Sequence, residues 1–413
     1  MQTQLADFIR DTPEGREAEA ILRKCVHCGF CTATCPTYQL LGDELDSPRG
    51  RIYLIKQALE GSPVTERTRL HLDRCLTCRS CETTCPSGVQ YGRLADIGRN
   101  LVESRVRRTP WDRVRRAALG FILPRTAWFG ALLRLGQMMR PLLPAGLRHK
   151  VPPRAAPAGL RPATRHARRV LALSGCVQPA LAPAINAAAA RVLDRIGISW
   201  IEASGAGCCG ALRFHLGDQD GGRDDMRALI DAWWPSVEHG TVEAIVTTAS
   251  GCGATVRDYV HLLAHDPEYR HKAARVSLLA RDLSEVMARE APALEKLLDS
   301  AARRARVAFQ SPCSLQHGQQ IRGVVEGMLA KAGYELTPVA DAHLCCGSAG
   351  TYSILQPELS MQLRTRKLAA LEADAPQAIA TANIGCLVHL QAATPTPVRH
   401  WVEFLDDALM GSE

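Results

Sequence analysis

The sequence predicts an α+β multidomain protein in which an α-helical, cysteine-rich N-terminal domain precedes a duplicated α/β domain. Three observations lead to this prediction. One cysteine motif, C-x2-C-x2-C-x3-C-P, occurs twice near the N-terminus. A longer pattern recurs with an offset of 137 residues in the C-terminal part. A basic, proline-containing stretch separates the two parts, and 413 residues are enough for two or three domains.

The paired motifs read CVHCGFCTATCP from Cys25 and CLTCRSCETTCP from Cys75. This spacing is typical of proteins that bind pairs of [4Fe–4S] clusters. The first three thiolates of each motif converge on one cluster, whereas the fourth points toward the neighbouring cluster. We therefore expect a ferredoxin-like domain with crossed ligand sets. One cluster is expected on Cys25, Cys28, Cys31 and Cys85, and the other on Cys35, Cys75, Cys78 and Cys81.

Neither zinc nor disulfide bonds explain these motifs as well as clusters do. A structural zinc site arranges its ligands in two pairs, not in two triplets with an outlying fourth cysteine. Residues 1–20 are polar and lack the apolar core of a signal peptide, so disulfide bonds are not expected. The sequence also has no apolar run of about 18 residues that would predict a membrane-spanning helix. These features predict a cytoplasmic protein that transfers single electrons.

Residues 1–104 are expected to form the cluster domain, built mainly from helices. A helix is predicted over residues 11–24, with Pro13 in its first turn. Two further helical patterns, IYLIKQALEG and ERTRLHLDR, lie between the cysteine motifs. Pro36 and Pro86 lack an N–H group, and we expect each of them to end a short helix.

Residues 105–168 form a basic connector that ends in a proline-rich linker. From Arg105 to Arg169 there are 16 lysines and arginines against one acid, although the whole chain carries a net charge of only +8. Two interpretations of the first part remain open. It forms either packed helices whose arginines face solvent or a partner subunit, or an amphipathic segment that lies on anionic lipid. The apolar face of that segment would comprise Trp111, Phe121, Trp128 and Phe129.

Nucleic acid is not an expected partner, because the basic stretch carries none of the motifs that bind it.

The C-terminal residues contain two copies of one pattern, expected over 169–300 and 301–413. In each copy, short aliphatic runs alternate with helical patterns, which predicts a parallel sheet covered by helices. Cysteines follow the ends of the predicted strands, where α/β folds place their ligands.

The motif Cys-Cys-Gly (CCG) occurs once in each copy, and its two thiols can reach one site only if they lie in a turn. Its glycine permits the backbone conformation that such a turn needs. Each copy also has a cysteine before and after this word, and four thiolates suffice for a further cluster or a metal ion. The alternative is that these cysteines are buried and structural. The two sets are Cys176, Cys208, Cys209 and Cys252, and Cys313, Cys345, Cys346 and Cys386.

Histidines also lie near these cysteines in the sequence. We expect each to form hydrogen bonds around the site and not to act as a metal ligand. They are His215, His317, His343 and His389.

The paired cluster motifs followed by two CCG repeats resemble the heterodisulfide reductase-like family of iron–sulfur proteins. The segments LDRCLTCRSCETTCPSGV, IDAWWP and TANIGC are closer still to the iron–sulfur subunits of glycolate oxidase, also called glycolate dehydrogenase. The resemblance covers essentially the whole chain. It implies a non-catalytic electron-transfer subunit that binds two [4Fe–4S] clusters on the eight N-terminal cysteines.

The same resemblance implies partners. They are an FAD-containing, glycolate-oxidising catalytic subunit, a second flavoprotein-like subunit and a membrane quinone as acceptor, with peripheral attachment to the inner face of the membrane. The chain departs from the heterodisulfide reductases in one respect. Their CCG units have a fifth cysteine, whereas the matching positions here are Thr255 and His389. A noncubane cluster, and disulfide reduction with it, is therefore in doubt.

Competing functions follow from the same features. The chain could serve a lactate or glycerol-3-phosphate dehydrogenase complex instead, or be a membrane scaffold that carries clusters. A protein of another class, a thiol–disulfide reductase that uses the CCG sites, is disfavoured by the missing fifth cysteines. No residue resembles a base for hydroxy-acid oxidation, and the absence of a GxGxxG loop argues against a nucleotide cofactor on this chain.

Overall fold

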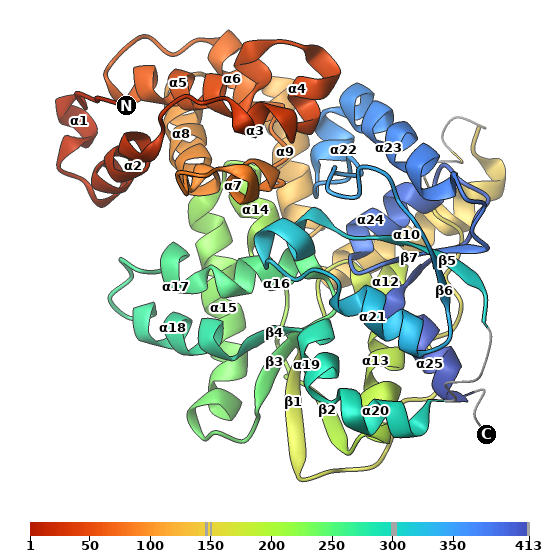
Figure 1. Cartoon of the computed structure of the whole chain (residues 1–413). Helices are drawn as coiled ribbons and strands as arrows, with labels where there is room; N and C mark the ends of the chain where they lie inside the picture. Colours follow the sequence, from red (N-terminus) through yellow and green to blue (C-terminus); the bar gives the residue numbers. More distant parts are fainter. Residues whose placement is uncertain (145–147, 149–150, 299–303, 411–413) are drawn as a thin grey trace.

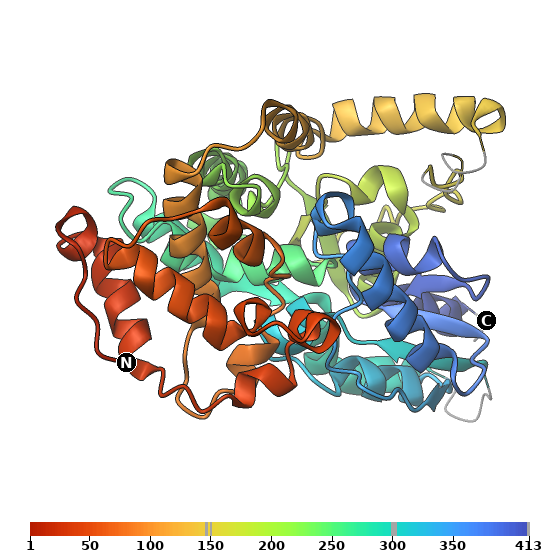
Figure 2. The same cartoon turned by 90° about the horizontal axis from the view of Figure 1, so that it is seen from above.

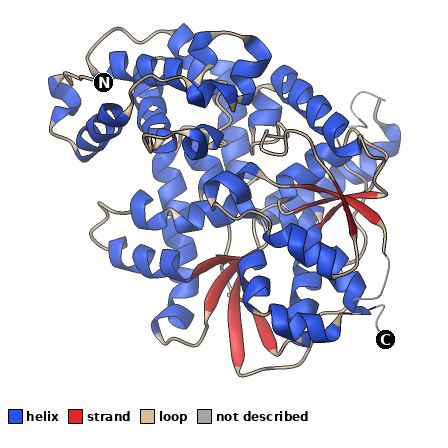
Figure 3. Cartoon of the chain, viewed as in Figure 1, coloured by secondary structure: helices blue, strands red, loops and turns tan. Residues whose placement is uncertain are grey.

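The computed structural model describes residues 1–144, 148, 151–298 and 304–410 (Figure 1). Helices dominate, and the strands form two separate four-stranded sheets (Figure 3). The N-terminal helices, red to orange in Figure 1, lie together at one end of the molecule. The described residues therefore show the predicted order of a helical domain followed by two α/β repeats.

The N-terminal domain is a helical bundle whose core includes Leu22, Ile55 and Leu94. The helix expected over 11–24 is α2, and the Thr12 side chain caps it by accepting a hydrogen bond from the backbone of Gly15. The elements are α1 (Asp7–Arg10), α2 (Pro13–Lys24), α3 (Phe30–Ala33), α4 (Pro36–Leu41), η1 (Glu44–Asp46), α5 (Pro48–Leu59), α6 (Glu66–Asp73), α7 (Ser80–Thr84) and α8 (Tyr91–Arg105).

The expectation for Pro36 is wrong. Helix α3 has already ended at Ala33, and Pro36 occupies the first position of α4. Proline fits there because the first N–H groups of a helix have no partner within the helix. Pro36 thus starts a helix directly after Cys35, which turns the chain away from the cysteine loop.

The connector contains two exposed helices, α9 (Pro110–Ile122) and α10 (Thr126–Met139), followed by η2 (Arg140–Leu142). Neither α9 nor α10 has a buried residue. In Figure 2, α10 (gold) runs along the outer edge of the molecule. Helix α10 contacts α12 (Gln178–Leu181), and its Gln137 side chain donates to the carbonyl oxygens of Pro152 and Pro153.

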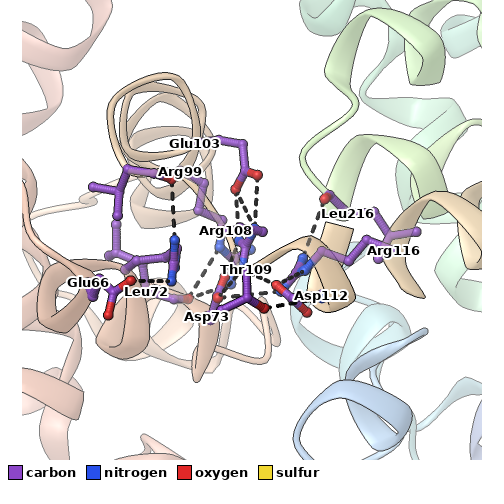
Figure 4. A network of polar contacts seen from close by, with 12 residues as sticks. Glu66, Leu72, Asp73, Arg99, Glu103, Arg108, Thr109, Asp112, Arg116 and Leu216 are labelled. Carbon is purple, nitrogen blue, oxygen red and sulfur yellow. Dashed lines mark hydrogen bonds and ion pairs between the residues drawn. The ribbon is translucent and has the colours of Figure 1, made fainter. Parts of the chain in front are cut away.

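A buried arginine fixes the start of this connector against the cluster domain (Figure 4). The Arg108 guanidinium bonds Asp73 at 2.8 and 3.0 Å, Glu103 at 2.8 Å and Asp112 at 3.1 Å. Burial by itself raises the pKa of Asp73, but hydrogen bonds and charge from Arg108 lower it overall. These contacts tie α9 to α6 and α8.

Each repeat contains a fully parallel sheet, in the orders β2-β1-β3-β4 and β6-β5-β7-β8. The strands β4 and β8 are not among the predicted aliphatic runs, because each has three residues that include an arginine and a terminal polar residue. The strands are β1 (Arg168–Leu173), β2 (Ile198–Glu202), β3 (Ala244–Thr247), β4 (Ala280–Asp282), β5 (Arg306–Gln310), β6 (Glu335–Thr337), β7 (Ala378–Thr381) and β8 (Val398–His400).

The helices of the repeats cover both faces of each sheet, as parallel sheets require. In the first repeat, besides α12, they are α13 (Ala184–Arg195), α14 (Ala211–His215), α15 (Gln219–Glu238), α16 (Ser250–Arg257), α17 (Tyr259–Leu262), α18 (Arg270–Leu279), α19 (Leu283–Arg289) and α20 (Ala291–Leu297). In the second they are η3 (Ser314–Gly318), α21 (Val324–Lys331), α22 (Tyr352–Leu355), α23 (Pro357–Glu372), α24 (Ile384–Gln391) and α25 (Trp401–Met410).

The two repeats share one hydrophobic core. Helices α13 and α25 contact each other, and the core between the sheets includes Val170 of the first repeat and Val307 of the second. The Ser250 hydroxyl at the start of α16 lies 2.8 Å from the Ser314 hydroxyl at the start of η3, which joins the two copies. The predicted boundary between residues 300 and 301 lies outside the described residues.

Candidate iron–sulfur and thiol sites

Five cysteines of the N-terminal domain line one cavity. Three come from the segment that runs from the end of α2 into α3, and two come from α7 and the residue that follows it. The loop turns sharply because His27 and Gly29 have left-handed backbones, with φ of 55° and 84°. The cavity is lined by Cys25, Cys28, Cys31, Cys81 and Cys85, and Arg49 also borders it.

The other three cysteines, together with Cys81, line a second cavity beside the first. Thr77 and Arg79 repeat the left-handed conformations of His27 and Gly29, with φ of 50° and 59°. The backbone N–H of Thr77 donates to the sulfur of Cys75 at 3.4 Å. The second cavity is lined by Cys35, Cys75, Cys78 and Cys81.

The grouping has the crossed form that the sequence analysis expected, since the last cysteine of each motif lines the cavity of the other. Pro48, Cys81 and Tyr91 line both cavities and so form the wall between them. Eight thiols in two adjacent groups of four match the donor sets of two [4Fe–4S] clusters. The residues therefore fit the cofactor, although the assignment of each ligand stays a prediction.

A buried arginine near the second cavity was not predicted from the sequence. Arg51 is only 1% exposed, and its guanidinium donates to Thr37 at 3.1 Å and pairs with Asp46 at 3.2 Å. Burial acts to raise the pKa of Cys75, but the positive charges of Arg51 and Arg99 lower it overall. A buried cation thus stabilises the thiolate form that a cluster requires. No sequence pattern distinguishes it from the exposed arginines.

The arginine beside the first cavity is less enclosed than Arg51. Burial, with smaller effects of neighbouring thiols, raises the pKa of Cys31 to about 11. Arg49 borders this cavity but is partly exposed and pairs with Glu44 at 2.5 Å. The two cavities thus differ in how far their neighbouring arginine is buried.

The first CCG repeat brings its four predicted cysteines into one group. The thiols of Cys176 and Cys209 hydrogen bond to Cys208, which lowers the pKa of Cys208, and Cys209 also bonds Cys252. The backbone N–H of Gly210 donates to Cys208 at 3.4 Å, and Gly210 has φ of 81°. The glycine therefore serves the turn as expected.

The second repeat has the same arrangement. Cys313 bonds Cys345, Cys345 bonds Cys346, and Cys346 bonds Cys386, so that the four thiols form a chain. The backbone of Gly347 donates to Cys345 at 3.4 Å, as Gly210 does in the first repeat. The structure thus brings together all four cysteines of each repeat, but this grouping alone does not identify what they bind.

Two of the nearby histidines, His317 and His389, form side-chain hydrogen bonds with groups other than cysteine. His317 Nδ1 lies 2.9 Å from the hydroxyl of Thr83, and its Nε2 lies 3.0 Å from the carbonyl oxygen of His343. His389 lies 3.2 Å from the Ser360 hydroxyl. His215 Nδ1 is 3.8 Å from an Asp96 oxygen.

Two family models match the chain. A 4Fe–4S dicluster domain covers residues 21–89, and a cysteine-rich domain matches twice, over residues 170–257 and 307–391. The N-terminal part is therefore a 4Fe–4S dicluster domain. Among the described residues, no helix is both long enough and apolar enough to cross a membrane.

Curated relatives extend this comparison to the full length. The glycolate oxidase iron-sulfur subunit of Escherichia coli (strain K12) is 56% identical over 409 residues, 99% of each chain. The probable glycolate oxidase iron-sulfur subunit of Bacillus subtilis (strain 168) is 31% identical over 91% of this chain and 90% of its own. Lactate utilization protein A of an Exiguobacterium species is 23% identical over 57% of this chain and 95% of its own.

Proposed function

Because the chain belongs to the family of glycolate oxidase iron–sulfur subunits, we propose that it relays electrons from the flavin of a glycolate-oxidising partner to a separate acceptor. The observation that carries this proposal is the pair of cysteine-lined cavities that share Cys81 as a common wall. Adjacent sites permit transfer between them. The chain is then the non-catalytic part of an oxidoreductase complex.

A bound [4Fe–4S] cluster carries single electrons, so a flavin reduced by two electrons is reoxidised in single steps. The residues of this chain hold and tune the sites. We assign Cys25, Cys28, Cys31 and Cys85 to one cluster and Cys35, Cys75, Cys78 and Cys81 to the other. Arg51 offsets the negative charge of the second set, and net charge is one of the factors that set cluster potentials.

The electron-relay proposal is tested with Cys28→Ser in the complete complex. The variant is expected to lose the signal of one cluster and most electron flow to the acceptor, while glycolate still reduces the flavin. Val26→Ala serves as the control, because Val26 lies in the same exposed loop but has no thiol. Unchanged acceptor reduction in Cys28→Ser would remove this cluster from the path. Glycolate oxidation by the isolated chain would contradict the non-catalytic role.

Lactate is a second candidate substrate of the complex, because the lactate utilization relatives align over almost their whole length. The identity is far lower than with the glycolate oxidase subunits, so glycolate is favoured. Rates of flavin reduction by glycolate and by lactate in the same complex decide between them.

The exposed face of α9 and α10 supports peripheral contact with the inner face of the membrane, and therefore a quinone as acceptor. Trp128, Leu132 and Leu135 are exposed at helical spacing on α10, with Trp128 56% exposed. The aromatic rings of Phe121 and Trp128 lie 6.2 Å apart, which continues the face onto α9. An apolar helix face in a basic segment fits an anionic bilayer.

Flotation with vesicles tests the membrane contact. The intact complex is expected to float with anionic vesicles, and Leu132→Glu combined with Leu135→Glu to weaken binding at least tenfold, on the order of the burial energy of one leucine. Leu278→Glu is the control, since Leu278 is exposed on α18 outside this face. An intact complex that stays unbound would refute the contact, and would leave this face to a partner subunit.

A further inference from the structure

One buried tyrosine of the cluster domain lies between the two cysteine-lined cavities. Tyr91, the first residue of α8, is 4% exposed and lines both cavities. Its ring belongs to the same core group as Cys25 and Cys81, and the side chain of Cys75 lies beside its hydroxyl. Tyr91 therefore forms part of the wall that separates the two predicted cluster sites.

The Tyr91 hydroxyl differs from those of the other buried tyrosines in its partner. The hydroxyls of Tyr259, Tyr334 and Tyr352 donate to backbone carbonyl oxygens at 2.9, 2.9 and 3.1 Å. The Tyr91 hydroxyl is fully buried, yet no oxygen or nitrogen of the described residues accepts its proton. Burying a hydroxyl without an acceptor is unfavourable. Phenylalanine would fill the same space without this cost, so the hydroxyl requires an acceptor of another kind.

The position of Tyr91 against the second motif is fixed by the helix that carries it. Arg99, about two turns further along α8, donates to the carbonyl oxygens of Leu72 and Cys75 at 3.0 and 2.6 Å. Between these two positions, Leu94 is fully buried in the core of the domain. The start of the second motif is thus held against α8 beside Tyr91.

Sulfur is the acceptor that the two cavities offer. A tyrosine hydroxyl keeps its proton at neutral pH, because its ordinary pKa is about 10, and it therefore acts as a donor. Hydrogen bonds to the sulfurs of a [4Fe–4S] cluster are among the factors that set its reduction potential. Reduction adds negative charge, so a donated hydrogen bond stabilises the reduced form and makes the potential more positive.

We propose that the Tyr91 hydroxyl donates a hydrogen bond to a sulfur of the second cluster, on the side of Cys75, and thereby makes the potential of that cluster more positive. The proton stays on the tyrosine, and no covalent bond forms or breaks. The inference rests on the assignment of a cluster to the second cavity, which is part of the proposed function, and is independent of the substrate of the complex.

A redox titration of the anaerobic complex, followed by electron paramagnetic resonance, tests this inference. Tyr91→Phe should keep the iron content of the wild type and make the potential of the second cluster more negative. At a fixed potential, the ratio of reduced to oxidised second cluster should fall about tenfold, which equals about 59 mV for one electron. The first cluster, identified as the one whose spectrum Cys28→Ser changes, should shift less. Tyr53→Phe is the matched control, since it removes an exposed hydroxyl from the same domain and should change neither potential.

A second readout uses the wild-type chain and does not need the variant to assemble. Protein labelled with tyrosine that carries a magnetic oxygen isotope in its hydroxyl should show a coupling between this oxygen and the reduced second cluster. The coupling should persist in Tyr352→Phe, because the Tyr352 hydroxyl already donates to the carbonyl oxygen of Arg74.

The contrary results are equally defined. An unchanged potential of the second cluster in Tyr91→Phe, with the iron content kept, would show that the hydroxyl does not tune this cluster. A shift of the first cluster that equals or exceeds that of the second would place the hydrogen bond elsewhere. A wild type without the isotopic coupling would exclude the contact even if Tyr91→Phe lost its clusters. A wild type that lacks one of the two cluster signals would instead contradict the proposed assignment itself, so the two failures are distinguished.

Discussion

At the scale of single residues, buried cations distinguish the thiol sites from one another. Arg51 lies beside the second N-terminal set and Lys367 beside the second CCG set, whereas the first CCG set has a carboxylate neighbour. Burying a cation costs several kcal/mol unless it is paired. Asp46 provides the opposite charge for Arg51, and the Lys367 ammonium donates to the carbonyl oxygens of Asp341 and Ala342.

Replacing Arg51 by Met leaves Asp46 buried with only part of its positive partners. We expect the free energy of unfolding of the cluster domain to fall by about 3–5 kcal/mol. Denaturant titration followed by the visible absorption of the clusters measures it. Arg49→Met provides the comparison, because Arg49 and Glu44 are both more than one third exposed and such pairs contribute about 1 kcal/mol or less. Equal losses in the two variants would contradict the special role of Arg51.

At the scale of elements, ion pairs hold the first turn of α9 against the cluster domain, whereas the rest of the helix is not buried. Its first turn is held by Arg108 and Asp112, which belong to the network shared with α6 and α8 (Figure 4). Further along, no residue of α9 or α10 is buried. The network thus positions an exposed apolar surface without covering it.

Arg108→Met is expected to loosen the start of α9, because three carboxylates lose their common partner and the longer Arg116–Asp73 contact, at 3.4 Å, is left to join α9 to α6. Amide hydrogen exchange in the first turns of α9 should accelerate at least tenfold, while exchange in the central strands β1 and β5 stays unchanged. Arg107→Met is the matched control, since Arg107 is exposed. If α9 exchanges as slowly in Arg108→Met as in the wild type, other contacts hold it.

At the scale of the whole molecule, the two repeats are joined through a buried histidine. His400 Nε2 donates to the carbonyl oxygen of Thr248 at 2.8 Å, and its Nδ1 accepts from the N–H of Val402 at 3.2 Å. Both ring nitrogens are thus used by the neutral form. Burial lowers the pKa of His400 to about 4.

This histidine predicts a dependence of stability on pH. Between the unfolded pKa of about 6.5 and the folded value, the unfolded chain binds one more proton, so stability falls as the pH falls. His400→Gln is expected to remove a slope of about 1.4 kcal/mol per pH unit in that range. The measured quantity is the difference between wild type and variant, because buried acids such as Asp282, with a pKa raised by burial to about 6, titrate in the same range with the opposite sign. A constant difference from pH 7 to pH 4 would refute it.

The sequence by itself determined the cluster chemistry, the family and the order of the domains. Cysteine spacing fixes which thiols can converge on one centre, and the pattern around Cys25 and Cys75 needs no tertiary information. Alternation of aliphatic runs with helices likewise predicted both parallel sheets, but β4 and β8 are too short and too polar to be detected in this way.

Tertiary structure alone decided which charges are buried and which sites are neighbours. Arg51 and Arg49 are two residues apart in the sequence, yet only Arg51 is enclosed. From the sequence, Lys367 would be expected on the exposed surface of its helix. In the folded chain it is buried, because α23 packs against the second repeat. Burial and contact between distant segments depend on how elements pack, and local residue patterns do not encode them.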